Sequence, residues 1–328
     1  MRILRTLHRR RRLTTLLGFA VLGLIGIAAP AVMGSEGLPV ARTADSPPAS
    51  QAVQVRTGMY MLNVGRLDTL TGTYNADFYL VFECDRPCDP GNFEFSNGRA
   101  TALDKQGDDP NGKTFRVQAS FNTDVDFRNY PFDKHKLLIS LEDKLLTKEQ
   151  LQYVVDPKLN AIDDHVIVGG WELHGWDAIV TDHYYPVFDE TYSRYEFFIH
   201  IQRGVLAAIL KSLLPALVIV LGGFLGFLLG PDKALQRLTI ATAALTGAIL
   251  FHVNLTSQVP PVGSLTYADK FMIVNYVGLV GALAATVAIL ILTDRKQEAR
   301  ALRIHRGSRL TVPIVWVVLQ GLVAWTLM

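Results

Sequence analysis

Residues 195–224 read YEFFIHIQRGVLAAILKSLLPALVIVLGGF, and this stretch changes character in its middle. Up to Gln202 the side chains alternate in the manner of a half-buried β-strand. From Gly204 onward the sequence stays apolar for longer than an ordinary strand, as in a membrane-spanning helix. Only Arg203 separates the two. The stretch therefore predicts a strand that enters a membrane helix without a linker, so that movement of the strand must act on the helix mechanically.

Four segments are long and apolar enough to cross a bilayer, because a helix rises about 1.5 Å per residue and about 20 residues cross the hydrocarbon core. They are Gly204–Leu229, Leu235–Thr256, Phe271–Leu292 and Leu310–Met328. The second segment is the most polar of the four and carries several threonines, His252 and Asn254. We expect a span of this composition to face protein or water rather than lipid.

Basic residues in the loops predict the orientation. The loop between the third and fourth spans carries Arg295, Lys296, Arg300, Arg303, Arg306 and Arg309, and the loop between the first and second carries Lys233 and Arg237. Loops rich in Lys and Arg stay on the cytoplasmic side. We therefore expect a multi-pass protein of the bacterial inner (plasma) membrane, with the polar residues 50–202 in the periplasm or outside the cell.

The N-terminal segment has the order of an export signal. Arginines among the first 12 residues precede the apolar run Leu13–Ala29, and small residues follow. We interpret residues 1–34 as a signal peptide or an uncleaved anchor. Residues 35–52, with their prolines, alanines and serines, are interpreted as a linker.

Residues 53–203 are interpreted as one exported domain and residues 204–328 as the membrane domain. The exported part holds short alternating segments separated by turn signals. Examples are Thr73–Phe82, Lys113–Phe121, Lys136–Leu141, Gly170–Val180 and Tyr195–Gln202. Short strands over about 150 residues predict a β-sandwich. The formal net charge of +2 gives no reason to expect a nucleic acid partner.

The chain has two cysteines, Cys84 and Cys88. A local disulfide would suit an oxidising exterior, and the other interpretation is a tight turn between strands. A metal site would need further Cys or His ligands nearby, and the stretch offers none. We predict no metal and no cofactor.

A second informative stretch is the loop VDFRNYPFD, residues 125–133, in which an aromatic-Pro-aromatic-Asp sequence precedes an alternating strand. It resembles the signature loop of the Cys-loop receptor superfamily, the pentameric ligand-gated ion channels. The prokaryotic members are the most similar, because Thr123 and Leu137 stand where the bracketing cysteines would be. Further matches follow in order along residues 55–328: Gly170-Trp171-Glu172, Arg203, Pro215, Val259-Pro260-Pro261, Leu265–Asp269 and Phe271-Met272.

The resemblance implies a β-sandwich extracellular domain, an all-α four-helix transmembrane domain and a homopentamer around a central pore. The second helix would line the pore, and agonist binding or protonation outside the membrane would open it. The implied partners are membrane lipid, a permeant ion, and either a small-molecule agonist or protons.

The second span supports a pore on its own residues. Thr239, Ala243, Thr246, Leu250 and Val253 recur at steps of four and three, so they share one helix face. Hydroxyl groups near the cytoplasmic end can replace part of an ion's water shell, and rings of Leu250 and Val253 can close the path by dewetting. The other interpretation is a polar seam buried between helices.

The selectivity region departs from the pattern of cation-selective relatives, which place a Glu just before the cytoplasmic end of this helix. Here the neighbourhood contains Asp232, the neutral Gln236 and Arg237. A ring of carboxylates attracts cations by focusing the local field. Asp232 lies more than a turn from Gln236, so we expect selectivity for monovalent cations only if Asp232 faces the pore.

The resemblance also implies a set of residues that couple the two domains. Asp133 and Arg203 correspond to an interfacial ion pair, and Asp68 to a third member of this cluster, although Asp68 also suits an ordinary turn. Pro131 is cis in the family's loop, and cis is tolerated at X–Pro bonds. Phe132 and Pro260 complete the coupling set.

Ligands of this superfamily bind between subunits under the hairpin before the last strand. The aromatic residues there, with acidic neighbours, suit a cationic amine: Tyr184, Tyr185, Phe188, Tyr192 and Tyr195. Alternatively, these rings simply pack across strands. If protons are the agonist, the candidates are Asp133, His135, His165, His174, His183 and His252.

Other function classes fit less well. The sequence has no nucleophile elbow, no phosphate-binding glycine loop and no His-x-x-x-His pair, so we predict that it is not an enzyme. A transporter would show repeated halves and broken midplane helices. The remaining alternative is a non-conducting membrane sensor or structural protein with the same fold.

Overall fold

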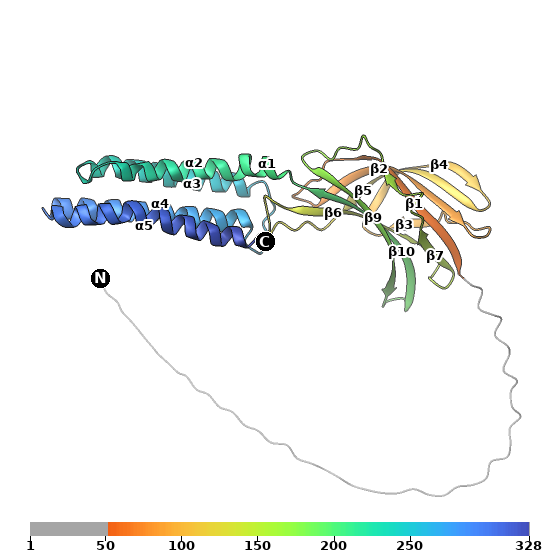
Figure 1. Ribbon diagram of the computed structural model, residues 1–328. Coiled ribbons are helices and arrows are strands. Elements are labelled where there is room, and N and C mark those ends of the chain that lie inside the picture. Colours follow the sequence, from red (N-terminus) through yellow and green to blue (C-terminus); the bar gives the residue numbers. More distant parts are fainter. Residues whose placement is uncertain (1–51, 328) are drawn as a thin grey trace, which may run out of the picture. The chain divides into compact units, whose positions relative to one another are not determined.

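The computed structural model describes residues 52–327. The predicted signal peptide or anchor (residues 1–34) and the predicted linker, apart from Ala52, lie outside the described residues. Ten strands and the helical segments of the described part follow one another along the chain, strands first, as Figure 1 shows.

The strands form two sheets within the described residues. The larger sheet has the order β4-β5-β2-β1-β7, with β8 also paired to β1, and the smaller has the order β3-β6-β10-β9. The bounds in the larger sheet are β1 (Val53–Val64), β2 (Thr73–Cys84), β4 (Gly98–Asp109), β5 (Gly112–Asn122), β7 (Leu151–Val155) and β8 (Ala161–Ile162). Those in the smaller are β3 (Phe93–Phe95), β6 (Lys134–Asp143), β9 (Glu172–Tyr185) and β10 (Glu190–Gln202). Most pairings are antiparallel, but β7 and β8 run parallel to β1.

The core of the sandwich comes from the alternation seen in the sequence. Strand β10 buries every second residue from Ser193 to Ile201, and β2 does the same from Tyr74 to Cys84. Side chains on the inner faces, such as Phe78, Phe82 and Phe197, are completely buried. Strand β4 is the exception, because its residues are exposed or half-buried and give no alternating apolar signal.

Cys84 and Cys88 are joined by a disulfide just after β2. The structure therefore agrees with the first interpretation of these cysteines, a local disulfide.

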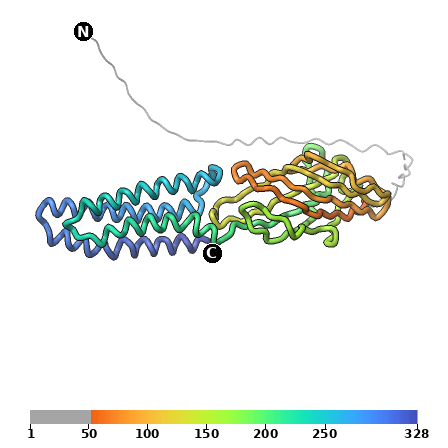
Figure 2. The backbone as a smooth tube through the Cα atoms, turned by 90° about the horizontal axis from the view of Figure 1, so that it is seen from above, coloured from red at the N-terminus to blue at the C-terminus, as the bar shows by residue number. Residues whose placement is uncertain are grey.

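Four helical segments of the described residues are long and apolar enough to cross a membrane, so the protein is a multi-pass membrane protein. The first comprises α1 (Val205–Ala208), a π-helical turn η1 (Ile209–Leu213), α2 (Leu214–Phe224) and a 3₁₀ turn η2 (Leu225–Leu228). The others are η3 (Pro231–Lys233) with α3 (Ala234–Thr256), α4 (Tyr267–Asp294) and α5 (Glu298–Trp325). Helix α2 packs on α3 and α4, α3 on α4, and α4 on α5; Figure 2 shows the helices alongside one another.

Two helices begin earlier than the hydropathy of the sequence predicts. Helix α4 begins at Tyr267 rather than Phe271, because Thr266 and Asp269 form a capping box that starts it. Helix α5 begins at Glu298 rather than Leu310. Its first turns carry exposed arginines on the outside and pack Ala301 inward against Ile289. Hydropathy marks where a helix is apolar, whereas the backbone is helical over a longer range.

The β-sandwich followed by four apolar helices is the fold class that the sequence predicts. The strand-to-helix junction is also as expected: β10 ends at Gln202, and α1 begins at Val205 with Gly204 as its N-cap.

Candidate functional site

The signature loop, residues 125–133, lies between β5 and β6 and is partly buried against the membrane helices. Its Tyr130–Pro131 peptide bond is cis. Phe127 and Tyr130 are almost completely buried, in one apolar cluster with Val259 and Phe271 from the α3–α4 loop and α4. The loop of the sandwich is therefore part of the core of the membrane domain at this end.

Backbone hydrogen bonds attach the same loop to the start of α4. The Tyr267 N–H donates to the Arg128 carbonyl at 2.8 Å, and the Ala268 N–H donates to the Tyr130 carbonyl at 3.0 Å. The Asp269 N–H donates to Thr266 Oγ1 at 3.1 Å within the capping box. The first N–H groups of a helix have no partner inside it. Here the signature loop supplies two of those partners.

The α3–α4 loop is held by two further contacts. The Tyr130 hydroxyl donates to Gln258 Oε1 at 3.2 Å, and the Thr69 hydroxyl donates to the Gln258 carbonyl at 3.4 Å. The ring of Phe132 meets that of Tyr267 edge to face at 5.6 Å. Sequence reasoning missed Gln258 and Tyr267; the capping-box pattern from Thr266 to Asp269 is the signal that would have located the start of α4.

Asp133 and Arg203 form the predicted ion pair between the signature loop and the strand–helix junction. Arg203 donates from Nε to Asp133 Oδ1 at 2.9 Å and from Nη2 to Oδ2 at 3.2 Å, and its backbone N–H donates to the Asp133 carbonyl at 3.1 Å. His135 Nε2 lies 2.8 Å from Asp133 Oδ2. The Asp133 side chain is fully buried, whereas that of Arg203 is 24% exposed.

Aromatic rings cover the cation of this pair. The Arg203 guanidinium lies 4.4 Å from the ring centroid of Trp171 and 5.2 Å from that of Tyr130. Burial raises the pKa of the Asp133 carboxyl, but hydrogen bonds from His135 and Arg203 and the charge of Arg203 outweigh burial. The pKa of Asp133 therefore lies below its usual range, and the pair is charged at neutral pH.

Asp68 does not join this cluster as an ion-pair partner. Its Oδ1 accepts a hydrogen bond from the Leu70 N–H at 2.9 Å, and its backbone bridges to Thr73. The ordinary turn is thus the role that the structure shows for Asp68. It does line, with Arg66, Trp171 and Arg203, a crevice of about 660 Å³ at the junction. Pro260 lies in the α3–α4 loop and lines a second crevice.

The predicted pore face of α3 points away from the other helices of the chain. Thr239, Ala243 and Thr246 are exposed, and Leu250 and Val253 are 66% and 63% exposed. The opposite face, with Ala241, Ala248 and Leu255, is buried against the neighbouring helices. The stripe is therefore not a seam inside this chain's own helix bundle.

The prediction that Arg237 belongs to the selectivity region is wrong. Its side chain is buried on the inner face of α3, where Nη1 lies 3.0 Å from His305 Nδ1 and the guanidinium lies 5.6 Å from the ring centroid of Phe227. It therefore does not face the same side as the pore stripe. Gln236 and Asp232, by contrast, are exposed.

The hairpin between β9 and β10 gathers four of the five predicted ligand aromatics. The Tyr184 hydroxyl donates to Asp189, that of Tyr185 to Glu142, and that of Tyr192 to Glu190, at 2.6 to 2.8 Å. Phe188 is 66% exposed, and its ring lies 6.3 Å from that of Tyr185. The hydrogen bond to Glu190 raises the pKa of Tyr192 to about 12. Aromatic rings and carboxylates are thus close together and accessible.

Tyr195 is wrong as a ligand candidate. It is completely buried between the sheets, and its hydroxyl donates to Asn160 Oδ1. Tyr195 lies in register with the inward-facing residues of β10, whereas Tyr184 and Tyr192 lie nearer the hairpin turn.

The proton candidates fall into two groups. His135 contacts a carboxylate at the junction and is buried, whereas His252 contacts a carboxylate in the membrane domain and is 22% exposed. His165 is exposed beside Asp163, His174 lies 3.9 Å from Glu172, and His183 packs edge to face on Tyr185.

Comparison with known proteins points to one family. No family model matches the chain. It is 25% identical over 210 residues to the proton-gated ion channel of Gloeobacter violaceus, a match that covers 64% of this chain and 58% of the relative. It is 23% identical over 166 residues to neuronal acetylcholine receptor subunit alpha-9-I of Oncorhynchus mykiss, covering 51% of this chain and 29% of the relative. A receptor subunit named alpha-9 from Gallus gallus is 22% identical over 176 residues, 54% of this chain and 36% of that subunit.

In sequence the chain is similar to channels and receptor subunits of the pentameric ligand-gated ion channel family. The match spans little more than half of the bacterial channel and about a third of each receptor subunit. These relatives are channels and receptor subunits, not enzymes, which agrees with the prediction from sequence. The Asp133–Arg203 pair and the loop contacts to α4 are the candidate coupling site.

We expect Asp133→Asn to cost about 3–5 kcal/mol of stability at neutral pH, because it leaves Arg203 without its buried partner. A pKa lowered on folding contributes stability that is complete above the unfolded value of about 3.9 and is lost as the pH falls through the folded value. The difference in thermal unfolding midpoint between the wild type and this variant should therefore shrink at acid pH. Asp126→Asn is the control, since its ion pair with Arg128 is exposed on both sides and contributes little to stability. A difference that stays constant from neutral to strongly acid pH would contradict the assigned charge state.

Proposed function

We propose that the chain is a subunit of a homopentameric ligand-gated ion channel whose pore is lined by α3. The single observation that carries this proposal is the two-sided character of α3. One face, from Thr239 to Val253, is exposed in the isolated chain, and the other is packed with small and apolar residues against α2 and α4. A polar helix face is costly in lipid. Five copies around an axis would instead enclose water with these faces.

The pore face supports conduction and closure at different levels. The hydroxyl of Thr239 donates to the Leu235 carbonyl one turn earlier, which leaves its oxygen lone pairs to face a passing ion. Leu250 and Val253 lie toward the other end of the helix, and rings of these side chains would close a narrow path by dewetting. A closed and an open state would then differ by a modest rotation or tilt of α3.

The junction supports transmission between the domains. The hairpin of β9 and β10 carries the aromatic and acidic residues, and β10 continues through Arg203 into α1. Asp133 holds Arg203, and the signature loop that contains Asp133 caps α4. A displacement of the hairpin strand would therefore reach both α1 and the α3–α4 loop.

Two kinds of agonist fit the structure, a cationic amine and protons. Tyr184, Tyr185, Phe188 and Tyr192, with their acidic neighbours, suit a cationic amine through cation–π contacts and carboxylate attraction. Protons are the other agonist, with His135 and His252, which both contact carboxylates, as the candidates. One relative is named a proton-gated channel, which agrees with protons as the agonist. Another is named an acetylcholine receptor subunit, which agrees with a cationic amine.

We propose the bacterial inner membrane as the location, with residues 53–203 in the periplasm and residues 1–34 as signal or anchor. The basic residues of the loop around Lys296 and of the first turns of α5 favour a cytoplasmic position for that end of the helices. The disulfide of Cys84 and Cys88 suits an oxidising compartment for the sandwich.

Cysteines placed at Thr239, Thr246 and Leu250 should react with water-borne thiol reagents in at least one state of the channel, because these positions would face water. Cysteines at Ala241 and Ala248, on the buried face of the same helix, are the matched controls and should stay protected. The recording that accompanies this test is current through liposomes that contain the purified protein, over a pH series and a panel of amines. Protection of all three pore positions in every condition, or the absence of any current, would leave a non-conducting sensor as the better description.

Reversal potentials under a salt gradient should lie toward the cation equilibrium value, because Asp232 is the exposed carboxylate nearest the cytoplasmic end of α3. Asp232→Asn should weaken this preference, while Gln236→Glu should strengthen it. Reversal near the chloride value would show that the cation assignment is wrong.

Arg203→Ala should leave pentamers assembled but abolish or greatly shift the response to agonist, since it frees the start of α1 from the signature loop. Arg128→Ala removes another arginine of the same region whose partner, Asp126, is exposed, and should leave the response nearly unchanged. Size-exclusion chromatography and evoked currents measure the two properties. Normal currents in Arg203→Ala would refute the coupling role.

A further inference from the structure

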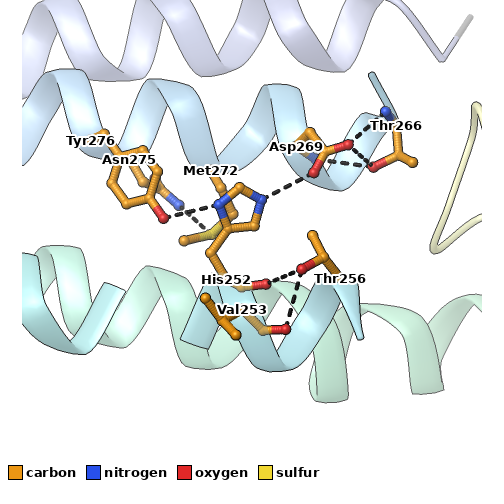
Figure 3. Close-up of polar contacts among 8 residues, drawn as sticks. All are labelled: His252, Val253, Thr256, Thr266, Asp269, Met272, Asn275 and Tyr276. Atoms are coloured by element: carbon orange, nitrogen blue, oxygen red, sulfur yellow. Dashed lines mark hydrogen bonds and ion pairs between the residues drawn. The ribbon is translucent and has the colours of Figure 1, made fainter. Parts of the chain in front are cut away.

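A second polar link, inside the membrane domain, joins the pore-lining helix to α4. His252 of α3 lies between two α4 side chains: its Nδ1 is 2.9 Å from the Tyr276 hydroxyl, and its Nε2 is 3.0 Å from Asp269 Oδ1 (Figure 3). The side chains of His252 and Asp269 are 22% and 18% exposed. The imidazole is thus held at both nitrogens by one neighbouring helix.

Asp269 carries this link into the coupling site. Its other oxygen, Oδ2, accepts hydrogen bonds from the Thr266 N–H and hydroxyl at 2.8 Å, as Figure 3 shows. The next two N–H groups, of Tyr267 and Ala268, donate to carbonyls of the signature loop. One carboxylate therefore connects α3, the cap of α4 and, through two adjacent residues, the loop of the sandwich.

The partners define what each charge state of His252 does. A carboxylate only accepts, so Nε2 carries a hydrogen in both states and donates to Asp269. In the neutral ring Nδ1 accepts from the Tyr276 hydroxyl. When a proton from water binds Nδ1, the hydroxyl turns to accept instead, and the contact to Asp269 becomes a charge-assisted ion pair. Protonation therefore strengthens the connection and breaks neither contact.

The site is partly open to solvent, since the His252 and Asp269 side chains are 22% and 18% exposed. The second crevice, of about 650 Å³, is lined by Val253 and Thr256 of α3, by the α3–α4 loop around Pro260, and by Asp269 itself. It brings solvent to the carboxylate that His252 contacts.

The charged surroundings of His252 are simple. On α4 the ionisable side chains at this end are Asp269 and Tyr276, with the buried Tyr267 and the half-buried Lys270. Helix α2, which also packs on α3, carries none over Leu214–Phe224, and Lys211 just before it is exposed. Asp269 is the one described carboxylate in ion-pair contact with His252.

We propose that His252 is a proton-responsive link that ties the pore-lining helix α3 to the cap of α4, so that acid pH favours the arrangement in which the two are joined. This inference rests on the proposed function, because it is the pore-lining role of α3 that turns the link into a control of gating. Histidine is the residue type whose unperturbed side chain changes charge between about pH 5 and pH 8. Acidification in this range therefore changes the attachment of α3 directly beside Val253 of the pore face.

His252→Gln is the decisive variant, because the glutamine amide can donate to Asp269 and accept from Tyr276 but cannot become charged. Between about pH 8 and pH 5 we expect the opening equilibrium of the wild type to change by about tenfold or more, within the range of typical couplings between sites. We expect His252→Gln to lose most of that change while it assembles normally. His165→Gln is the matched control, since His165 is exposed on the sandwich, and should retain the full pH response.

A second readout does not need conduction. A cysteine at Val253 is modified with a water-borne thiol reagent in the wild-type and His252→Gln backgrounds, and the ratio of the two rates cancels the pH dependence of the thiol itself. We expect this ratio to change several-fold from about pH 8 to pH 5.

The two readouts separate the two proposals. If the ratio of modification rates depends on pH but no current is recorded, the proposed His252 link is supported and the proposed channel function is overturned. Agonist-evoked currents whose pH dependence is the same in His252→Gln as in the wild type, with a constant ratio, overturn the link and leave the channel intact.

Discussion

The buried ion pair between Asp133 and Arg203 constrains the rest of the structure more than any other contact. A fully buried carboxylate needs its counter-charge and its hydrogen bonds, since the cost of leaving it alone exceeds that of most core substitutions. Arg203 is also the residue that joins β10 to the first membrane segment. The pair therefore fixes the point at which the chain leaves the sandwich, relative to strand β6. Rings of Trp171 and Tyr130 cover part of the Arg203 guanidinium through cation–π contacts.

A second constraint comes from the backbone of α4. The first N–H groups of a helix need acceptors, and in this protein the signature loop and the capping box provide them. The loop cannot move away without leaving the Tyr267 and Ala268 donors unpaired. Because Phe127 and Tyr130 of that loop are also buried among membrane-domain residues, the sandwich and the helices share one core at the junction. Rearrangement at this point must be concerted rather than local.

Several functional assignments depended on the direction in which a side chain points. The exposed stripe of α3 follows the helical repeat, and it was predicted from that repeat. Arg237 and Tyr195 were assigned to functional faces because of their charge or aromatic ring. Their positions in the helical and strand repeats instead place both side chains in the core. Asp68 was placed by resemblance, whereas its carboxylate is used locally by the Leu70 N–H. Gln258 and Tyr267 act through partners distant in the chain, and no local pattern marks such partners.

The sequence alone determined the fold class, the approximate positions of the membrane spans, the main strands and the candidate pore face, because hydropathy and periodicity are local properties that the chain expresses wherever it folds. The three-dimensional structure decided the starts of α4 and α5, the side to which Arg237 and Tyr195 turn, and the link of His252 with Asp269 and Tyr276. These features depend on pairing between segments far apart in the chain. Hydrogen bonds and ion pairs of that kind are chosen by packing, which composition and spacing do not encode.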